Sequence, residues 1–470
     1  MSEASLNWRE AWLPRGGLPA PLDQGHGPVS VARSPGRLDF LGGEAAFGGS
    51  MILAWPIREG CEVAVRAASD RRVVALSAGF AGEPDRDLLE WSLDELLSHS
   101  PEGLRQSLVQ DARTSWGAHL IPLVLRISRQ SGGTGGSGLR VLVRSSIPRG
   151  VGLAASSALE LAAARALADL CELDLGSRKI SDLVFEEQSW FDPLLEPAVL
   201  ESLYAARAGR LLPILCQASD CAEPETLSKD QFPQAVLLPD SGGGWRENVL
   251  RFRVAAGMGY RLVADQMGLE LVAGQPAGGN DPYYGGYLAN IDPVTFASEF
   301  RDRLPPELLG EAFLSEYDGL VDARYQVDPA VSYPVRNAVR FVLAENHRTC
   351  TFISALHRHR DPESTVPEEV LGALLEQSLA ESRTLDLVSR QAVFLAQQLK
   401  QRGDGRGVLG VRSSAGQGVL VLLSQEHEEL ERTVAQSVAT FEREYGGAAV
   451  VLRGSSEGAG AAESLLRIDA

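Results

Sequence analysis

A glycine-rich segment followed by two serines has the residue types and spacing best suited to chemistry. The segment Pro148–Ala168 reads PRGVGLAASSALELAAARALA and follows an alternating apolar stretch. Gly150 and Gly152 permit a positive φ and a close backbone approach. Ser156 and Ser157 supply hydroxyls, and the helix after them points its N-terminal N–H groups and positive dipole end at the loop. The pattern predicts a phosphate-binding loop, with simple helix capping as the alternative.

The elements that must position this loop alternate between strand and helix patterns. A strand pattern precedes the loop, and further strand patterns recur at 234–239, 407–411, 419–423 and 448–452. Helical patterns dominate 306–401. Glycine-rich or loop-like stretches separate the regular regions at 130–138, 274–286 and 402–407. We therefore expect an α/β part with the loop, a helix-rich middle and an α+β C-terminal part.

Composition and charge narrow the classes of partner. The chain has 470 residues and a formal net charge of −18, which argues against nucleic acid or an anionic membrane as a partner. The five cysteines are odd in number and include no Cys-x-x-Cys pair, so we expect reduced thiols and no structural metal. No apolar run is long enough for a bilayer, and the first residues lack an export pattern. These features predict a cytoplasmic protein.

A second glycine-rich segment makes the loop more specific. Val31–Glu59 reads VARSPGRLDFLGGEAAFGGSMILAWPIRE, with a Ser-Pro-Gly-Arg start ahead of a Gly-Gly turn. In this order, the two segments resemble the first two signature motifs of the GHMP small-molecule kinases. Within that superfamily the chain resembles the galactokinase and L-arabinokinase branch, and the arabinokinase kinase domain most closely. Shorter phrases extend the resemblance toward the C-terminus, among them LLPILCQ, DPAVSYPVRNAVRFVLAENHR and RGSSEGAG.

The resemblance implies a fold and a reaction. The fold has two lobes, an N-terminal α/β domain at 1–230 with the phosphate loop and a C-terminal α+β domain at 231–470, and ATP and sugar bind in the cleft between them. The reaction is transfer of the γ-phosphoryl group of ATP, with Mg²⁺, to the anomeric hydroxyl of a monosaccharide. The implied partners are a small-molecule sugar and a nucleotide, and a dehydrogenase interpretation of the loop lacks the Gly-x-Gly-x-x-Gly pattern.

The resemblance assigns the nucleotide and metal positions residue by residue. The nucleotide-binding set is Pro148, Gly150, Gly152, Ser156 and Ser157. For the metal, Ser156 matches a serine that contacts phosphate and magnesium, and Glu187 matches a glutamate that binds magnesium. The alternatives are that Ser156 only caps its helix and that Glu187 is a solvated surface charge.

The position at which relatives carry the catalytic base differs most from the family pattern. Relatives place an aspartate twelve residues after the metal glutamate, and Val199 stands there in this chain. Valine cannot accept a proton. Glu201 is the carboxylate nearest to that position, but two residues on a helix amount to roughly a 200° turn, which would face it away. Arg37 matches the arginine that relatives set beside the aspartate, so Arg37 and Glu201 are the candidate catalytic residues.

The residues at the family's sugar-binding positions also differ from the family pattern. The Thr-Asp-Tyr of the first motif, whose aspartate holds sugar hydroxyls, appears here as Ala45, Ala46 and Phe47. In the third motif, serine and alanine replace several glycines, although Gly416 remains. Glu44 and Asp240 could compensate, so the sugar-site neighbourhood comprises Glu44, Ala46, Phe47, Asp240 and Gly416.

Two function classes follow. In the first, the chain is a weakly active or non-catalytic sugar-kinase-family protein, a pseudokinase that binds nucleotide, sugar or a protein partner. The combined loss of the base, the sugar-binding aspartate and the third-motif glycines favours this class. In the second, it is an active galactokinase- or arabinokinase-like sugar 1-kinase with a rebuilt site. A loose phosphoryl-transfer transition state tolerates loss of a base, so the sequence leaves both classes open and its status as an enzyme uncertain.

Overall fold

The chain folds into two compact units, each assembled from separated segments. The computed structural model describes residues 8–12, 17–77, 88–110, 116–130, 137–217, 220–227, 231–238, 244–275, 280–361, 366–414, 418–424 and 428–469. Unit 1 comprises Met1–Leu38, Trp55–Leu212 and Gly454–Ala470, and unit 2 comprises Asp39–Ala54 and Pro213–Arg453. The boundary expected at residue 230 concerns family domains, which these contact-based units do not test, and it stays a prediction.

Unit 1 contains a sheet and a layer of helices. Its strands are β1 (His26–Leu41), β2 (Met51–Ala68), β3 (Arg72–Ser77), β4 (Leu88–Ser92), β5 (Gly138–Ser145), the start of β6 (Arg210–Leu215) and β15 (Leu465–Ile468), with β1 and β2 each crossing a unit boundary. Its helices are η1 (Leu22–Gln24), α2 (Leu93–Ser98), α3 (Pro101–Val109), α4 (Gly117–Gln130), α5 (Ala155–Leu170), α6 (Ser177–Gln188), α7 (Pro197–Ala205) and η5 (Ala462–Ser464).

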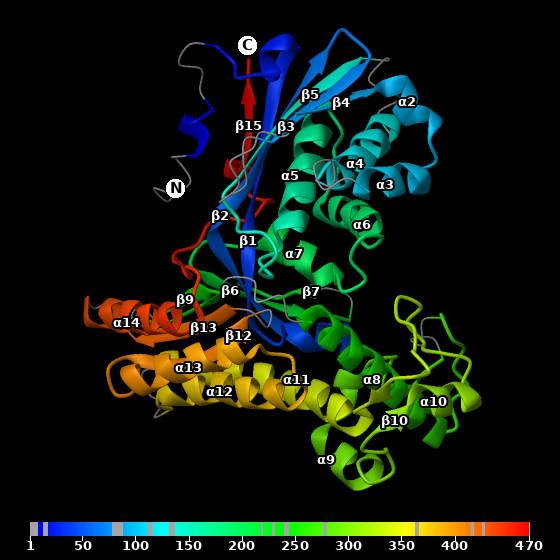
Figure 1. The fold of residues 1–470 in the computed structure, drawn as a ribbon, viewed down its shortest axis with the longest axis vertical. Helices are drawn as coiled ribbons and strands as arrows, with labels where there is room; N and C mark the ends of the chain where they lie inside the picture. Colours follow the sequence, from blue (N-terminus) through cyan, green and yellow to red (C-terminus); the bar gives the residue numbers. More distant parts are fainter. Residues whose placement is uncertain are drawn as a thin grey trace. The chain divides into compact units, whose positions relative to one another are not determined.

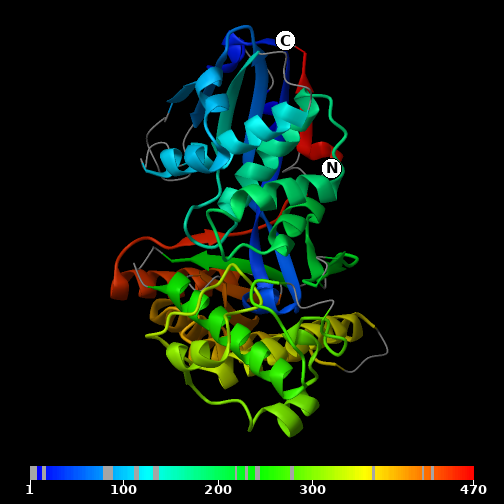
Figure 2. The ribbon, with the colours of Figure 1, turned by 90° about the vertical axis from the view of Figure 1, so that its right-hand side faces the viewer.

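Strand β5 lies inside the sheet of unit 1, and its first six residues are buried. The strand order of the sheet is β15-β1-β2-β5-β3-β4; β5 pairs antiparallel with β2 (Val143 opposite Val63) and parallel with β3 (Leu139 opposite Val73). Figures 1 and 2 show α4, α5 and α6 over one face. Trp8 of the N-terminal segment packs in a cluster that includes residues of β1, β2 and β5. The loop after β5 therefore starts from a central strand whose buried residues are packed into the core and whose last two residues are half-buried.

Unit 2 is richer in helix. Its elements are η2 (Gly43–Gly48), β7 (Asp220–Cys221), β8 (Glu225–Thr226), β9 (Gln231–Leu237), α8 (Trp245–Gln266), η3 (Leu288–Asn290), α9 (Pro293–Thr295), η4 (Phe296–Phe300), β10 (Leu308–Leu309), α10 (Gly310–Glu316), β11 (Ser332–Tyr333), α11 (Val335–Arg360), α12 (Glu369–Thr384), α13 (Arg390–Gly403), β12 (Val408–Ser414), β13 (Gly418–Ser424), α14 (Glu428–Tyr445) and β14 (Val450–Leu452).

The core of unit 2 lies between a four-stranded sheet and its helices. The strand order is β12-β13-β9-β14, and each pairing is antiparallel. Leu395 and Leu399 of α13 and Phe441 of α14 are fully buried in one cluster with residues of these strands. The strands expected at 234–239, 407–411, 419–423 and 448–452 correspond to β9, β12, β13 and β14, so the mixed α/β and α+β fold class is confirmed. Among the described residues, no helix is long and apolar enough to span a membrane.

Candidate functional site

The loop between β5 and α5 has an unusual run of backbone conformations. Gly150 and Gly152 both have φ of 76°, and Ala154 has φ of 59°, in the left-handed region that L residues with a Cβ rarely adopt. A Cβ built on Gly150 would meet nothing within 4 Å. Pro148, half-buried, precedes this run. Alternating left-handed residues turn successive N–H groups to one side, and such nests bind anions.

The start of α5 is not capped by a side chain. Its N-cap residue is Ala154, which has no side-chain acceptor. Ser156 and Ser157 therefore lie inside the first turn rather than at the cap. The Ser157 hydroxyl donates to Oε1 of Gln188 in α6 at 2.9 Å, while Ser156 is half-buried. The first-turn N–H groups and the helix dipole are thus directed at the loop, as a bound phosphate would require.

Strand β1 and helix α7 bring Arg37 beside this loop. The Arg37 N–H donates to the carbonyl of Leu153 at 3.1 Å, and its Nη1 donates to Oγ of Ser202 at 3.3 Å. Val199 precedes Ser202 by three residues on α7, so the two lie on the same helical face. This is the face of α7 that Arg37 contacts.

Glu201 lies on another face of α7. Its carboxylate lies near Ser181 and Arg178 of α6, and burial raises its pKa above the ordinary value. The rotation expected for two helical residues is therefore seen, and the candidate carboxylate is directed at α6. The assignment of Arg37 and Glu201 as a catalytic pair remains a prediction.

Glu187 is held by two arginines. Nη2 of Arg105 in α3 contacts its Oε2, and Nη1 of Arg126 in α4 lies 3.0 Å from its Oε1. The Glu187 side chain is only 10% exposed, so the alternative of a solvated surface charge does not describe it. Both oxygens that a metal would need are engaged by guanidinium groups. Glu187 therefore does not fit a Mg²⁺ ion as it stands.

A second buried acid lies further along α5. The carboxyl group of Glu160 forms a hydrogen bond of 2.6 Å with Nδ1 of His119 in α4, and the Glu160 side chain is 1% exposed. Burial raises the pKa of Glu160 to about 7. Across the described residues, no cluster of three or more His, Cys, Asp or Glu side chains could hold a metal ion.

In unit 2, the turn η2 places Glu44 against a fully buried arginine. Nη2 of Arg412, in β12, contacts Oε2 of Glu44, and Nη1 of Arg412 lies 3.0 Å from the carbonyl oxygen and 3.3 Å from Oδ2 of Asp39. Burial raises the pKa of Glu44 to about 8, against the opposing effect of Arg412. The Oε1 atom of Glu44 has no hydrogen-bond partner in the described part of the chain.

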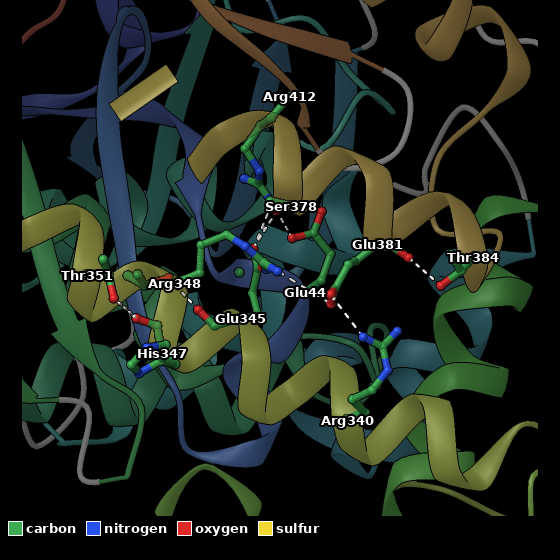
Figure 3. A network of polar contacts seen from close by, with 12 residues as sticks. Glu44, Arg340, Glu345, His347, Arg348, Thr351, Ser378, Glu381, Thr384 and Arg412 are labelled. Atoms are coloured by element: carbon green, nitrogen blue, oxygen red, sulfur yellow. Dashed lines mark hydrogen bonds and ion pairs between the residues drawn. The ribbon is translucent and has the colours of Figure 1, made fainter. Parts of the chain in front are cut away.

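The network extends from Arg412 into two helices (Figure 3). Oε1 of Glu345 in α11 lies 3.8 Å from Nη2 of Arg412 and accepts from Ser378 of α12 at 2.7 Å. Arg348 contacts the other oxygen of Glu345 and lies 3.4 Å from Glu381. Glu44 is therefore part of a buried array of ionisable side chains that connects η2, β12, α11 and α12.

The other sugar-site positions are apolar or lie outside the described residues. Ala46 is buried, and the ring of Phe47 packs edge-to-face on Phe252 of α8 with centroids 5.4 Å apart. Arg253 lies with its guanidinium carbon 5.2 Å from the Phe47 ring centroid. Asp240 and Gly416 lie outside the described residues.

The sequence interpretation missed the arginines. Arg412 is a cation inside an otherwise apolar strand, GVLGVRSS, and that contrast is the signal that could have found it. Arg105 and Arg126 carry no such signal, because arginine on a helix is ordinarily a surface residue.

The chain has relatives among known proteins. Residues 119–189 match the N-terminal domain of GHMP kinases. The chain is 25% identical over 492 aligned positions to L-arabinokinase of Arabidopsis thaliana, covering 92% of this chain and 46% of that protein. It is 26% identical over 216 positions to galactokinase of Roseiflexus sp. (strain RS-1), covering 46% of this chain and 47% of that protein. The chain spans about half the length of these curated relatives or less.

Two solved structures share the fold. Galactokinase of Lactococcus lactis, complexed with galactose, superposes with a TM-score of 0.64 at 16% identity, covering 92% of this chain and 94% of that chain. Mevalonate kinase of Methanococcus jannaschii gives a TM-score of 0.56 at 10% identity, covering 94% and 99%. At these identities the likeness concerns the fold.

Proposed function

This chain belongs to the GHMP kinases, in the branch of galactokinase and L-arabinokinase, and from that premise we propose that it binds ATP at the loop between β5 and α5. The run of left-handed residues at Gly150, Gly152 and Ala154 supports this proposal, since it lies next to an uncapped helix start. Backbone N–H groups and the dipole of α5 would hold the phosphates, and the Ser156 hydroxyl would add a donor.

We further propose that the protein phosphorylates sugars weakly or not at all. The observation that carries this proposal is on α7: its Arg37-facing side presents Val199 and Ser202, while Glu201 lies beside α6. A positioned base that takes the proton of the attacking hydroxyl contributes typically 10²- to 10⁴-fold to a rate. Its loss would leave an ATP and sugar site with little turnover.

The residues of the first motif also support the proposal of weak or absent sugar phosphorylation. A sugar recognised by carboxylates needs oxygens free to accept from its hydroxyls. Here Ala46 and Phe47 are apolar, and Oε2 of Glu44 contacts Arg412, which leaves Oε1 as the one oxygen of that carboxyl able to accept. Such a protein would act as a cytoplasmic sensor or regulator that responds to a sugar and a nucleotide, with a protein partner to receive the signal.

Calorimetric titration and ADP release together test this proposal. ATP is titrated in the presence and absence of Mg²⁺, with and without a panel of pentoses, hexoses and uronic acids, and ADP release is followed for each pair that binds. We expect saturable nucleotide binding and little sugar-dependent ADP release. Rapid, sugar-dependent ADP release would establish an active sugar 1-kinase with a rebuilt site, and absence of any nucleotide binding would overturn the proposed loop function.

A further inference from the structure

The partners of Glu187 are fixed parts of unit 1. Arg105 lies in α3 and Arg126 in α4, and each contacts a different oxygen of the carboxylate. The side chains of Arg105 and Glu187 are 8% and 10% exposed. The guanidinium carbon of Arg105 also lies 5.0 Å from the ring centroid of Trp190. Arg105 would therefore lose its contacts with Glu187 and Trp190 if its side chain turned toward solvent.

Other ionisable side chains lie near Glu187 and its two arginines. Arg126 makes a second ion pair, with Glu186, whose side chain is 58% exposed. Buried Glu160, beside His119, is close enough for its pKa to respond to both Glu187 and Arg105. Arg126 therefore has two carboxylates as ion-pair partners, whereas buried Arg105 relies on Glu187.

The cluster lies beside the proposed nucleotide loop. Gln188, the residue after Glu187, accepts a hydrogen bond from Ser157 in the first turn of α5 at 2.9 Å. This bond is buried and joins α6 to the helix that starts at the loop. The carboxylate that the family resemblance assigns to magnesium is therefore in the right neighbourhood but already has partners.

A divalent cation at this carboxylate conflicts with those partners. Mg²⁺ binds oxygens at about 2.0–2.1 Å and demands near-octahedral geometry. A cation so close to Glu187 would stand a few ångströms from the guanidinium groups that share its oxygens, and like charges repel strongly where water is excluded. Moving the carboxylate toward the metal would instead leave Arg105 buried without its counter-charge, which is strongly destabilising.

We propose that Glu187 is a structural anchor for Arg105 and Arg126, and that nucleotide binds this protein without a divalent cation at Glu187. The proposal rests on the nucleotide-binding function proposed above. A loop that presents N–H groups and a helix dipole favours the more negative form of the ligand, so removal of the metal does not weaken binding.

Nucleotide titration tests the metal-free binding. ATP is titrated calorimetrically into the protein in EDTA and, separately, with Mg²⁺ in excess. We expect the two dissociation constants to agree within about threefold, or the metal-free one to be tighter. A gain of about tenfold or more on adding Mg²⁺ would overturn the inference. Glu187→Gln is expected to leave the ratio of the two constants unchanged.

Melting of the ligand-free protein tests the anchor independently. Glu187→Gln removes the charge that buried Arg105 and partly exposed Arg126 share, and we expect the Tm to fall by roughly 5 °C or more. Glu186→Gln is the matched control, because the neighbouring pair is exposed, and its Tm is expected to change by less than about 1 °C. An unchanged or raised Tm for Glu187→Gln is the behaviour of a carboxylate kept for a metal and would overturn the anchor.

The two experiments separate the failure of each proposal. Absence of ATP binding both in EDTA and with Mg²⁺ overturns the proposed function and, with it, the nucleotide half of this inference. The melting temperatures of the Glu187 and Glu186 variants need no nucleotide, so they still decide whether the carboxylate belongs to the arginines. Binding that requires Mg²⁺ supports the proposed function while it overturns the further inference.

Discussion

The faces of α7 present different side chains to different neighbours. On α7, Val199 and Ser202 share a face that Arg37 contacts, whereas Glu201 lies near Arg178 and Ser181 of α6. A shift of two positions along a helix moves a side chain to the other side of its axis. Glu201 therefore lies on a different side of α7 from position 199, although the two positions are almost adjacent in the sequence.

Restoring a carboxylate on the correct face tests this argument. We expect Val199→Asp to raise sugar-dependent ADP release by about 10²-fold, the lower end of what a positioned base contributes. The measurement is a coupled ADP assay with the sugar that binds most tightly. Val199→Asn has a similar shape but accepts no proton, and it should keep the parent rate. Equal rates for the two variants would contradict the importance of a missing base.

Buried Glu44 makes stability depend on pH. Burial raises its pKa from 4.5 to about 8, so the folded protein keeps a proton that the unfolded chain releases. The stability that this proton contributes is fully present below about pH 4.5 and is lost as the pH rises through about 8. Over that window the free energy of unfolding should fall by up to about 1.4 kcal/mol per pH unit.

Replacing the titrating group should remove that slope. Glu44→Gln mimics the protonated acid at every pH, so we expect its Tm to lose less than that of the parent protein between pH 5 and pH 8. The variant should match the parent at acidic pH and gain relative to it at alkaline pH. Glu431→Gln, in a half-exposed pair with Arg453, should follow the parent profile. Parallel profiles for the parent and Glu44→Gln would show that Glu44 does not titrate in this range.

The loop between β5 and α5 is the element whose local chemistry is most constrained. Gly150 and Gly152 adopt positive φ at no steric cost, but Ala154 adopts a φ of 59° with a Cβ. A left-handed conformation costs an L residue roughly 1–2 kcal/mol. Because Ala154 is the N-cap residue and α5 begins at Ala155, this strain is a feature of the loop rather than of the helix that follows.

Glycine substitutions at two neighbouring alanines should have opposite effects. Ala154→Gly relieves the left-handed strain and also increases the entropy of the unfolded chain, so we expect a net gain in unfolding free energy of about 0.5 kcal/mol. Ala155→Gly, the first residue of α5, should instead cost about 0.5–1 kcal/mol. Denaturant titration of both variants measures the difference. A loss of stability in both would place Ala154 outside the left-handed region.

Two interleaved units make up the molecule. Unit 1 takes its last strand from the C-terminal segment Gly454–Ala470, and unit 2 takes η2 from Asp39–Ala54. β15 pairs antiparallel with β1, with Val29 opposite Ile468. Ser456 adds a hydrogen bond of 2.8 Å to the carbonyl of Ile57. Neither unit is therefore encoded by one continuous stretch of the sequence.

A fragment cut at residue 230 should consequently be defective. It lacks β15, so β1 becomes an uncovered edge of the unit 1 sheet, and exposed edges promote aggregation. We expect fragment 1–230 to elute as aggregates in size-exclusion chromatography and to melt below the full chain. Addition of a peptide of residues 454–470 should restore part of the monomer. A monomeric fragment that melts like the full chain would contradict this dependence.

Local patterns predicted the loop and most of the strands. The glycine and serine spacing after an apolar strand specifies a turn and a helix start, because φ freedom and hydroxyl positions depend on adjacent residues. Strand patterns at 407–411, 419–423 and 448–452 predicted β12, β13 and β14 for the same reason. The sequence also shows a valine at position 199, where the family resemblance implies an aspartate, and whether this chain lacks a base there stays a prediction.

The sequence by itself determined which groups are present, but only the tertiary structure decided what holds them. Glu187 meets Arg105 across 82 positions, and Glu44 meets Arg412 across 368. No local pattern encodes such pairs, because burial of a charge depends on every layer packed around it. A glutamate that is accessible to solvent can bind a metal ion. A glutamate whose two oxygens contact guanidinium groups is instead an ion-pair partner of those arginines. That difference arises from the packing of α3 and α4 against α6.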